Sequence, residues 1–222
     1  MKEFYTANQL EIIRGCLHAR DKSTQVGFIS HAGVGMKHAI RKLLDDYPHE
    51  KIIYADVQYS GVVTEVCVAL ITVCSNVRFS NLNYKKAELF DLVRILKDRM
   101  KKDVKGRPLI VLDNVWALNN EQLKYLNSFL TIYGDTCGIV LRTTKRSLER
   151  FKKANPEVFE KFYSHTISEW LVLEENTERE IGQLASTYGI KDTMFIQELA
   201  VSTKNFSIAK KYIDKYKNRE PK

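Results

Sequence analysis

The chain has 222 residues, of which 44% are hydrophobic and 28% are charged, and it contains only four prolines. This composition supplies enough apolar side chains for a buried core and excludes a chain that is disordered throughout. The 35 lysines and arginines exceed the 27 aspartates and glutamates, so the net charge is +8. Such an excess favours anionic partners, nucleic acid first and a phosphorylated ligand second, although a solvated basic surface would also produce it.

The cysteines and histidines indicate neither a disulfide framework nor a metal centre. No C-x-x-C pair and no H-E-x-x-H motif is present, so we expect reduced core thiols and no resident metal. The longest apolar run, residues 62–74, is broken by polar side chains, and the N-terminal stretch lacks the apolar segment of a signal peptide. We therefore expect a cytoplasmic protein with no membrane partner. The four cysteines are Cys16, Cys67, Cys74 and Cys137.

Short apolar runs alternate along the chain with amphipathic segments of helical length. The first four runs are mostly continuous, as expected for parallel strands that are covered on both faces. This alternation, with a glycine loop after the first run, predicts an α/β fold with a three-layer parallel sheet of about five strands. The expected strands are 25–30, 51–57, 108–113, 138–143 and 167–173, and the expected helices between them are 35–46, 61–74, 85–102, 120–132 and 144–161.

Capping residues predict further helices at both ends of the chain. Thr6 is expected to cap an N-terminal helix, and three helices are expected after Leu173. Asn176 or Thr177 would cap the first of these and Gly189 would end it; Asp192 would cap the second, and the third would run from Phe206 to about Tyr216. The predicted organisation is therefore an N-terminal helix (1–22), an α/β core (23–174), a helical bundle (175–218) and a frayed tail (219–222).

The segment ISHAGVGMKHAI, residues 29–40, resembles the phosphate-binding Walker A pattern G-x-x-x-x-G-K-[ST] but lacks its anchors. Met36 occupies the lysine position and Lys37 the Ser/Thr position. One step along a helix rotates a side chain by roughly 100°, so Lys37 cannot simply replace the lysine. His38 is a poor Mg²⁺ ligand. The loop is either a weak anion site built from backbone N–H groups or a turn kept for the fold, and the missing lysine favours the turn. The candidate nucleotide-binding residues are Gly33, Val34, Gly35, Met36, Lys37 and His38.

The segment RPLIVLDNVWAL has the form of a Walker B strand, in which a terminal aspartate holds Mg²⁺. Asp113 is that aspartate. Asn114 follows it. Nucleotide-hydrolysing proteins with a Walker B strand usually have a glutamate at this position, and an amide cannot act as a base. The alternative is that Asp113 caps a nearby loop or pairs with a lysine, and the absent metal hydroxyl favours this alternative.

Taken together, the strand, the glycine loop, LIVLDN, GIVLRT and the C-terminal helices resemble an AAA+ module from about residue 23 to residue 216. More narrowly, they resemble the transposition ATPases of the Mu phage B protein and insertion-sequence helper type. The resemblance implies a P-loop core with a small helical lid, ATP or ADP with Mg²⁺ as ligand, and DNA and a transposase as partners. It also implies assembly of several copies of the chain.

The same resemblance locates the family's remaining catalytic positions. Thr143 or Thr144 stands at the sensor position after the fourth strand. His165 stands where an arginine is often found, and Ser207 and Ile208 stand where the lid commonly has its arginine. With the lysine, metal hydroxyl, glutamate and lid arginine all replaced, we expect no efficient hydrolysis, because these groups supply most of the catalysis of phosphoryl transfer.

A cluster of positive residues follows the fourth predicted strand. It could contact the phosphate backbone of a nucleic acid, and no base-reading motif accompanies it, so binding would be sequence-tolerant. A solvated face is the alternative. The candidates are Arg142, Lys145, Arg146, Arg150, Lys152 and Lys153.

These observations lead to three hypotheses about function. The first is a degenerate AAA+-like protein without a required cofactor, acting as a DNA- or protein-binding accessory of a transposition or mobile-element system. The second is an ATP-binding transposition protein whose loop works in an unorthodox way, with Lys37 or a partner subunit restoring the charge. The third is an interaction scaffold that needs no nucleotide.

Overall fold

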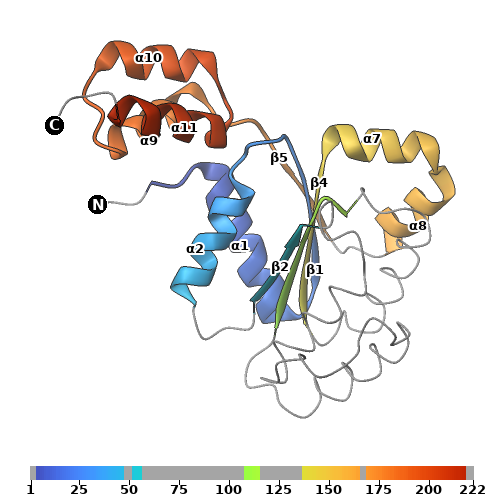
Figure 1. Ribbon diagram of the computed structural model, residues 1–222. Helices are drawn as coiled ribbons and strands as arrows, with labels where there is room; N and C mark the ends of the chain where they lie inside the picture. The colour runs from blue at the N-terminus through green and yellow to red at the C-terminus, as the bar shows by residue number, and fades with distance from the viewer. Residues whose placement is uncertain (1–3, 48–51, 57–107, 116–136, 166–168, 219–222) are drawn as a thin grey trace, which may run out of the picture. The chain divides into compact units, whose positions relative to one another are not determined.

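The computed structural model describes residues 4–47, 52–56, 108–115, 137–165 and 169–218 (Figure 1). The chain divides into two compact units, one formed by segments 1–14, 30–45 and 172–222 and the other by 15–29 and 46–171. The glycine loop and the helix after it thus belong with the C-terminal helices. This grouping cuts across the predicted division of the chain near residue 174.

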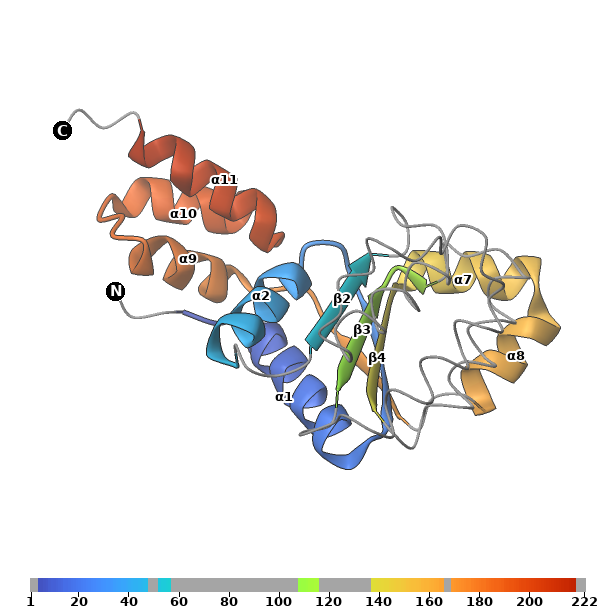
Figure 2. The same ribbon diagram turned by 60° about the horizontal axis from the view of Figure 1, so that its bottom comes forward.

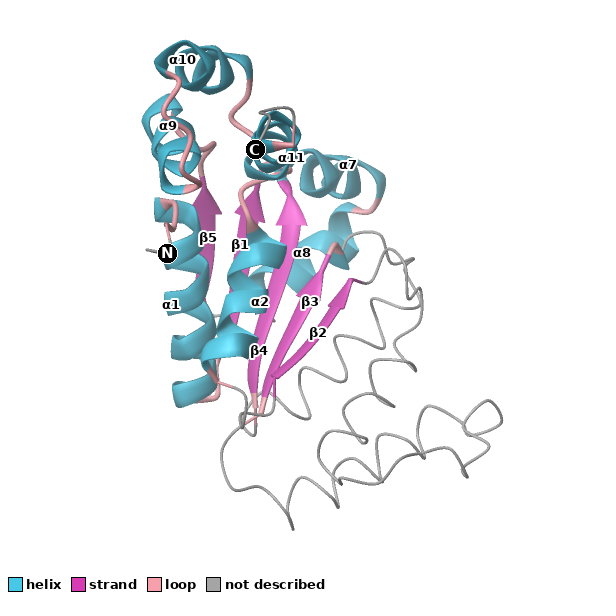
Figure 3. Ribbon diagram, turned by 60° about the vertical axis from the view of Figure 1, so that its left-hand side comes forward, coloured by secondary structure: helices cyan, strands magenta, loops and turns pink. Residues whose placement is uncertain are grey.

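The described strands form one sheet in the order β2-β3-β4-β1-β5. β2 pairs with β3 and β3 with β4, both in parallel, and Figure 3 shows these three strands running in the same direction. The five predicted strands are confirmed to within two residues at each end. Their bounds are β1 (Gln25–Ser30), β2 (Ile52–Asp56), β3 (Leu109–Asp113), β4 (Gly138–Thr144) and β5 (Glu169–Leu173).

The central strands are buried along their length, which explains their unbroken apolar sequences. Every residue of β3 is buried, and so are the first six residues of β4. A strand covered on both faces has no solvent-facing side that would favour polar residues at alternate positions. The α/β class predicted from the sequence is therefore confirmed.

The helix α1 (Ala7–Lys22) begins at a reciprocal cap. The Gln9 N–H donates to Thr6 Oγ1 at 3.3 Å, and the Thr6 N–H donates to Gln9 Oε1 at 3.1 Å. Such a capping box satisfies two backbone donors that a helix start otherwise leaves without partners. The predicted role of Thr6 is confirmed.

The single helix predicted over residues 144–161 is wrong, because the structure has two helices there. α7 (Lys145–Ala154) is capped by Asn155, and α8 (Pro156–His165) begins at the residue after this cap. A proline ring disfavours helical backbone at the residue before it, and Asn155 has φ −145° and ψ 66°. Pro156 then occupies the first position of α8, where its missing N–H costs nothing.

The C-terminal helices form the predicted three-helix bundle, which Figure 2 shows as three helices lying against one another. Thr177, Asp192 and Asn205 cap α9 (Glu178–Thr187), α10 (Thr193–Ser202) and α11 (Phe206–Lys217). A cluster of buried side chains holds the bundle together, and α2 (Met36–Asp46) belongs to the same compact unit. The cluster comprises Ile181, Leu184, Ala185, Ile190, Leu199, Phe206, Ala209 and Ile213.

Several predictions concern segments outside the described residues, namely the helices over 61–74, 85–102 and 120–132 and two of the cysteines, Cys67 and Cys74. Of the other two, Cys16 and Cys137 are buried free thiols, as expected. Within the described part of the chain, no helix combines the length and the apolar character needed to cross a membrane.

Candidate functional site

The glycine loop between β1 and α2 has the backbone of a tight turn but no lysine at its end. Gly33 and Gly35 have φ +87° and +99°, a region that glycine enters without steric cost. Met36, at the lysine position, is 5% exposed and packs in the core. Lys37 is exposed, and the His38 ring lies 5.0 Å from the ring of Phe206 on α11. Lys37 therefore places its charge where the motif requires a hydroxyl, and the lysine position is occupied by an apolar side chain.

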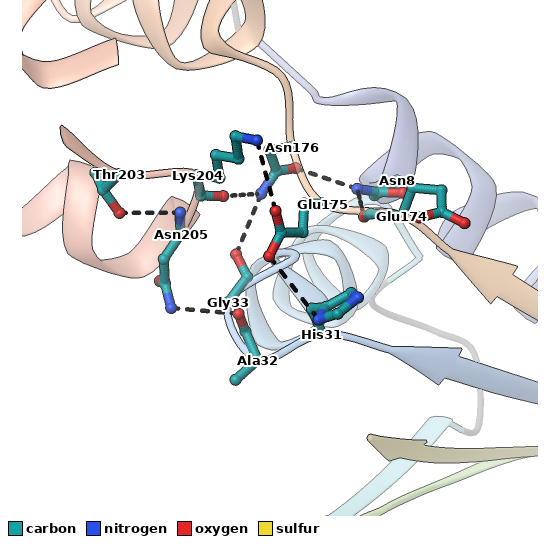
Figure 4. Close-up of polar contacts among 10 residues, drawn as sticks. All are labelled: Asn8, His31, Ala32, Gly33, Glu174, Glu175, Asn176, Thr203, Lys204 and Asn205. Carbon is teal, nitrogen blue, oxygen red and sulfur yellow. Dashed lines mark hydrogen bonds and ion pairs between the residues drawn. The ribbon is translucent and has the colours of Figure 1, made fainter. Parts of the chain in front are cut away.

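The carbonyl oxygens of the loop are bound by residues of the C-terminal bundle (Figure 4). Gly33 O accepts the Phe206 N–H at 2.8 Å and Asn176 Nδ2 at 3.3 Å. Ala32 O accepts Asn205 Nδ2 at 3.3 Å. Sequence reasoning considered Asn176 only as a helix cap and did not single out Asn205. An asparagine just before a helix is a recognisable cap, but nothing local shows that its amide also reaches a loop far away in the sequence.

Asn176 connects three segments of this unit. Its side chain is almost fully buried; Nδ2 donates to Lys204 O at 2.9 Å as well as to Gly33 O, and Oδ1 accepts from Asn8 Nδ2 at 3.3 Å. Asn8 Nδ2 also donates to Glu174 O at 2.8 Å. The start of α1, the glycine loop and the approach to α11 are thus joined through one buried amide.

An acidic residue next to Asn176 lies between two basic ones. Glu175 Oε1 is 3.9 Å from His31 Nδ1, and its Oε2 is 3.7 Å from Lys204 Nζ. All three side chains are about half exposed, so these pairs contribute little to stability.

The Walker B-like carboxylate belongs to the other unit and is bound by a cation. Arg142 Nη1 donates to Asp113 Oδ1 at 2.8 Å, and the Tyr54 hydroxyl donates to Oδ2 at 2.8 Å. The Asp113 and Arg142 side chains are only 2% and 9% exposed. Arg142 was predicted as a surface contact for nucleic acid, and this is wrong, because burial and the ion pair remove it from the surface. Asp113 pairs with a cation, as one interpretation held, but with an arginine rather than a lysine, and the role of Tyr54 was missed.

Asn114 and the two threonines have local structural roles. Asn114 has φ +60°, a conformation in which asparagine is enriched among non-glycine residues, and its Oδ1 accepts from Arg142 Nη1 at 3.3 Å. Thr143 is buried, and its hydroxyl donates to Thr144 O at 3.4 Å. Thr144 caps α7, accepting the Ser147 N–H at 3.1 Å. Whether either threonine senses a ligand stays a prediction.

The residues present do not fit a conventional Mg²⁺–nucleotide. Both oxygens of Asp113 already accept hydrogen bonds, and a carboxylate paired with a guanidinium is a poor ligand for a dication. Among the residues that the structure describes, no group of three or more His, Cys, Asp or Glu side chains could hold a metal ion.

The remaining predicted cations lie on α7. The helix buries Phe151, and its five lysines and arginines are exposed. Lys152 Nζ also lies 5.5 Å from the centre of the Phe159 ring. The structure thus brings these five residues together on one short helix: Lys145, Arg146, Arg150, Lys152 and Lys153.

Neither a family model nor a curated protein matches the sequence, whereas solved structures do. The ORC1 protein of Aeropyrum pernix, solved with DNA, is similar over 82% of this chain and 48% of its own, with a TM-score of 0.61 and 17% identity. A Walker-type ATPase of Pyrococcus abyssi is similar over 96% of this chain and 74% of its own, with a TM-score of 0.58 and 13% identity. The fold is that of the AAA+ P-loop ATPases.

A third AAA+ neighbour is the ORC2 protein of Aeropyrum pernix as ADPNP–ADP complexes, with a TM-score of 0.55, 13% identity, and coverage of 84% of this chain and 53% of its own. The chain thus spans about half the length of the two ORC proteins. At these identities the likeness establishes the AAA+ fold alone. The narrower resemblance to transposition ATPases stays a prediction.

Proposed function

We propose that this AAA+-type chain is a DNA- or protein-binding accessory, in a transposition or other mobile-element system, that does not hydrolyse ATP efficiently. One observation carries the proposal. The carboxylate expected to hold Mg²⁺, that of Asp113, is buried against Arg142 and accepts a second hydrogen bond from Tyr54. A metal would have to displace a charge-assisted hydrogen bond in a poorly hydrated site.

The glycine loop supports the same proposal. Phosphoryl transfer depends on cations and donors that are aimed at the charge that develops on the transferred group. Here Met36 is buried at the lysine position, and Asn114 stands at the position of the base. Each replacement removes a different contribution, so no single residue could restore the reaction.

Nucleotide binding and hydrolysis can be measured separately on the full chain. We expect isothermal titration with ATP or ADP plus Mg²⁺ to give weak or no binding, and a phosphate-release assay to stay at the buffer rate. Micromolar binding together with measurable phosphate release would overturn the proposal.

The exposed cations of α7 support DNA as the partner, and a neighbour of the same fold was solved with DNA. Contacts with phosphates carry no sequence information and weaken steeply with salt. Fluorescence anisotropy with labelled duplexes of unrelated sequence should therefore give similar affinities, which fall as salt is raised.

A charge-reversal pair of variants tests the surface itself. Reversing Lys145, Arg146 and Arg150 to glutamate should weaken DNA binding by about tenfold or more. The matched control reverses Lys211, Lys215 and Lys217, exposed lysines of α11, with the same change in net charge. Equal losses in both variants would show that net charge and not α7 determines binding. Absence of binding at low salt would favour a protein-binding scaffold.

Nucleotide binding without turnover is the second candidate. The two positive-φ glycines keep the form of a phosphate loop, and the ORC2 neighbour was solved with ADPNP and ADP. Titration that gives binding with no phosphate release would favour this candidate over the first.

A further inference from the structure

Hydrogen bonds from backbone and side-chain groups of the protein itself connect the glycine loop to the C-terminal bundle. The side-chain amides of Asn176 and Asn205 donate to the carbonyls of Gly33 and Ala32 (Figure 4), and the Phe206 N–H is a third donor, to Gly33 O. We infer that these contacts form a latch, which holds the start of α11 on the loop whether or not a nucleotide is bound. The latch is defined by Ala32, Gly33, Asn176, Asn205 and Phe206.

Asn205 couples the start of a helix to the loop. Its Oδ1 accepts the Ile208 N–H at 3.1 Å and so caps α11, while its Nδ2 donates to Ala32 O. The two ends of one amide therefore have separate roles. A Cβ atom at Gly33 would overlap the Asn205 side chain, so the glycine leaves room for the latch in addition to adopting a positive φ.

Solvent exchange of the Phe206 N–H shows directly whether the latch is closed. It is the first residue of α11, and the first N–H groups of a helix have no acceptor within the helix. The Phe206 N–H instead donates to Gly33 O at 2.8 Å. If the latch opens, this hydrogen bond is lost and the amide should exchange with solvent.

The latch uses different groups of the loop from those that a bound nucleotide would need. A phosphate accepts hydrogen bonds and therefore needs donors from a loop, whereas the latch occupies carbonyl acceptors of the loop. The two interactions do not compete for the same groups. The position of the bundle on the loop should then be insensitive to nucleotide, and this holds whether or not the chain hydrolyses ATP.

Amide exchange measured by NMR on the full chain tests the inference without any variant. In the wild type, the Phe206 N–H should exchange about fivefold more slowly than that of Thr193, the first residue of α10, because one hydrogen bond is worth about 1 kcal/mol. Addition of ATP and Mg²⁺ should leave the Phe206 rate unchanged. Equal rates for Phe206 and Thr193, or marked slowing of Phe206 by ATP, would overturn the latch.

Two isosteric variants test the donors. Asn205→Asp keeps the capping oxygen and Asn176→Asp keeps the side-chain shape, but each removes the latch's amide donor. Both should speed Phe206 exchange by about fivefold. The control Asn218→Asp makes the same change at the far end of α11, outside the latch, and should leave the rate unchanged. Circular dichroism checks that each variant is folded. Unchanged Phe206 exchange in both folded latch variants would refute the inference. If either variant fails to fold, the comparison of Phe206 with Thr193 in the wild type decides.

Discussion

Arg142 on β4 lies directly opposite Asp113 on β3, and its Nη1 is 2.8 Å from Asp113 Oδ1 with both side chains buried. An ion pair of this kind is costly to break from one side, because the remaining charge stays buried without its counter-charge. The pair therefore occupies the Asp113 carboxylate and also contributes to the stability of the sheet.

Removal of the arginine should expose this cost. Arg142→Met should lower the free energy of unfolding by about 3 kcal/mol, measured by urea denaturation. Adding Asp113→Asn to that variant should recover part of the loss, because no buried charge then remains unpaired. Arg150→Met, on the exposed surface of α7, is the control and should cost less than about 0.5 kcal/mol. An equally small effect for Arg142→Met would contradict the pairing.

Two glycines with the same backbone angle separate strain from steric overlap. Gly189 has φ +86°, close to the +87° of Gly33, but a Cβ atom there would meet nothing within 4 Å. Gly189→Ala should cost about 1–2 kcal/mol, the penalty of a left-handed conformation. Gly33→Ala should cost clearly more, because the new methyl group would meet Asn205. Adding Asn205→Ser, which keeps a capping hydroxyl, should remove much of the excess, and equal costs for both alanine variants would argue against the contact.

The loop can be given the missing Walker A side chains. Met36→Lys with Lys37→Thr should raise nucleotide affinity in titration calorimetry, while phosphate release stays near background because Asp113 and Asn114 are unchanged. The variant should also unfold more easily, because Met36 is buried and an ammonium group there loses hydration. Lys37→Thr alone is the control. Nucleotide binding as tight in the wild type as in the double variant would show that the native loop already works.

Asp192 should make the bundle sensitive to acid. The Phe195 N–H, the Tyr216 hydroxyl and the Met194 N–H all bond its carboxylate and hold the pKa of this group below its usual value. The resulting stabilisation is fully present above the unfolded-state pKa of about 3.9 and is lost as the pH falls through the lower folded-state value. The difference in unfolding free energy between wild type and Asp192→Asn should therefore be constant from about pH 7 to pH 5 and shrink below about pH 4. A gap that persists in strong acid would contradict this assignment.

Features determined by neighbouring residues could be predicted, and features determined by distant ones could not. Continuous apolar runs located β3 and β4, and the Thr6, Thr177 and Asp192 caps located their helices. The helix break at Pro156 also has a local cause, but the amphipathic pattern continues across the proline and therefore predicted a single helix.

The pairing of Arg142 with Asp113 depends on the register of two strands, which the sequence does not specify. An arginine among threonines and lysines therefore looked like part of a surface. The amide of Asn205 likewise meets Ala32 across most of the chain, and no local pattern indicates that contact.

The backbone at Asn114 limits how this protein could change. Its φ of +60° suits asparagine, and its side chain accepts from Arg142, so the residue matches its position in two ways. Asn114→Glu would place a longer side chain in a conformation that costs about 1–3 kcal/mol for most residues. Introduction of a glutamate after Asp113 would thus need a new turn after β3 as well as a new side chain, and the single substitution should lower stability.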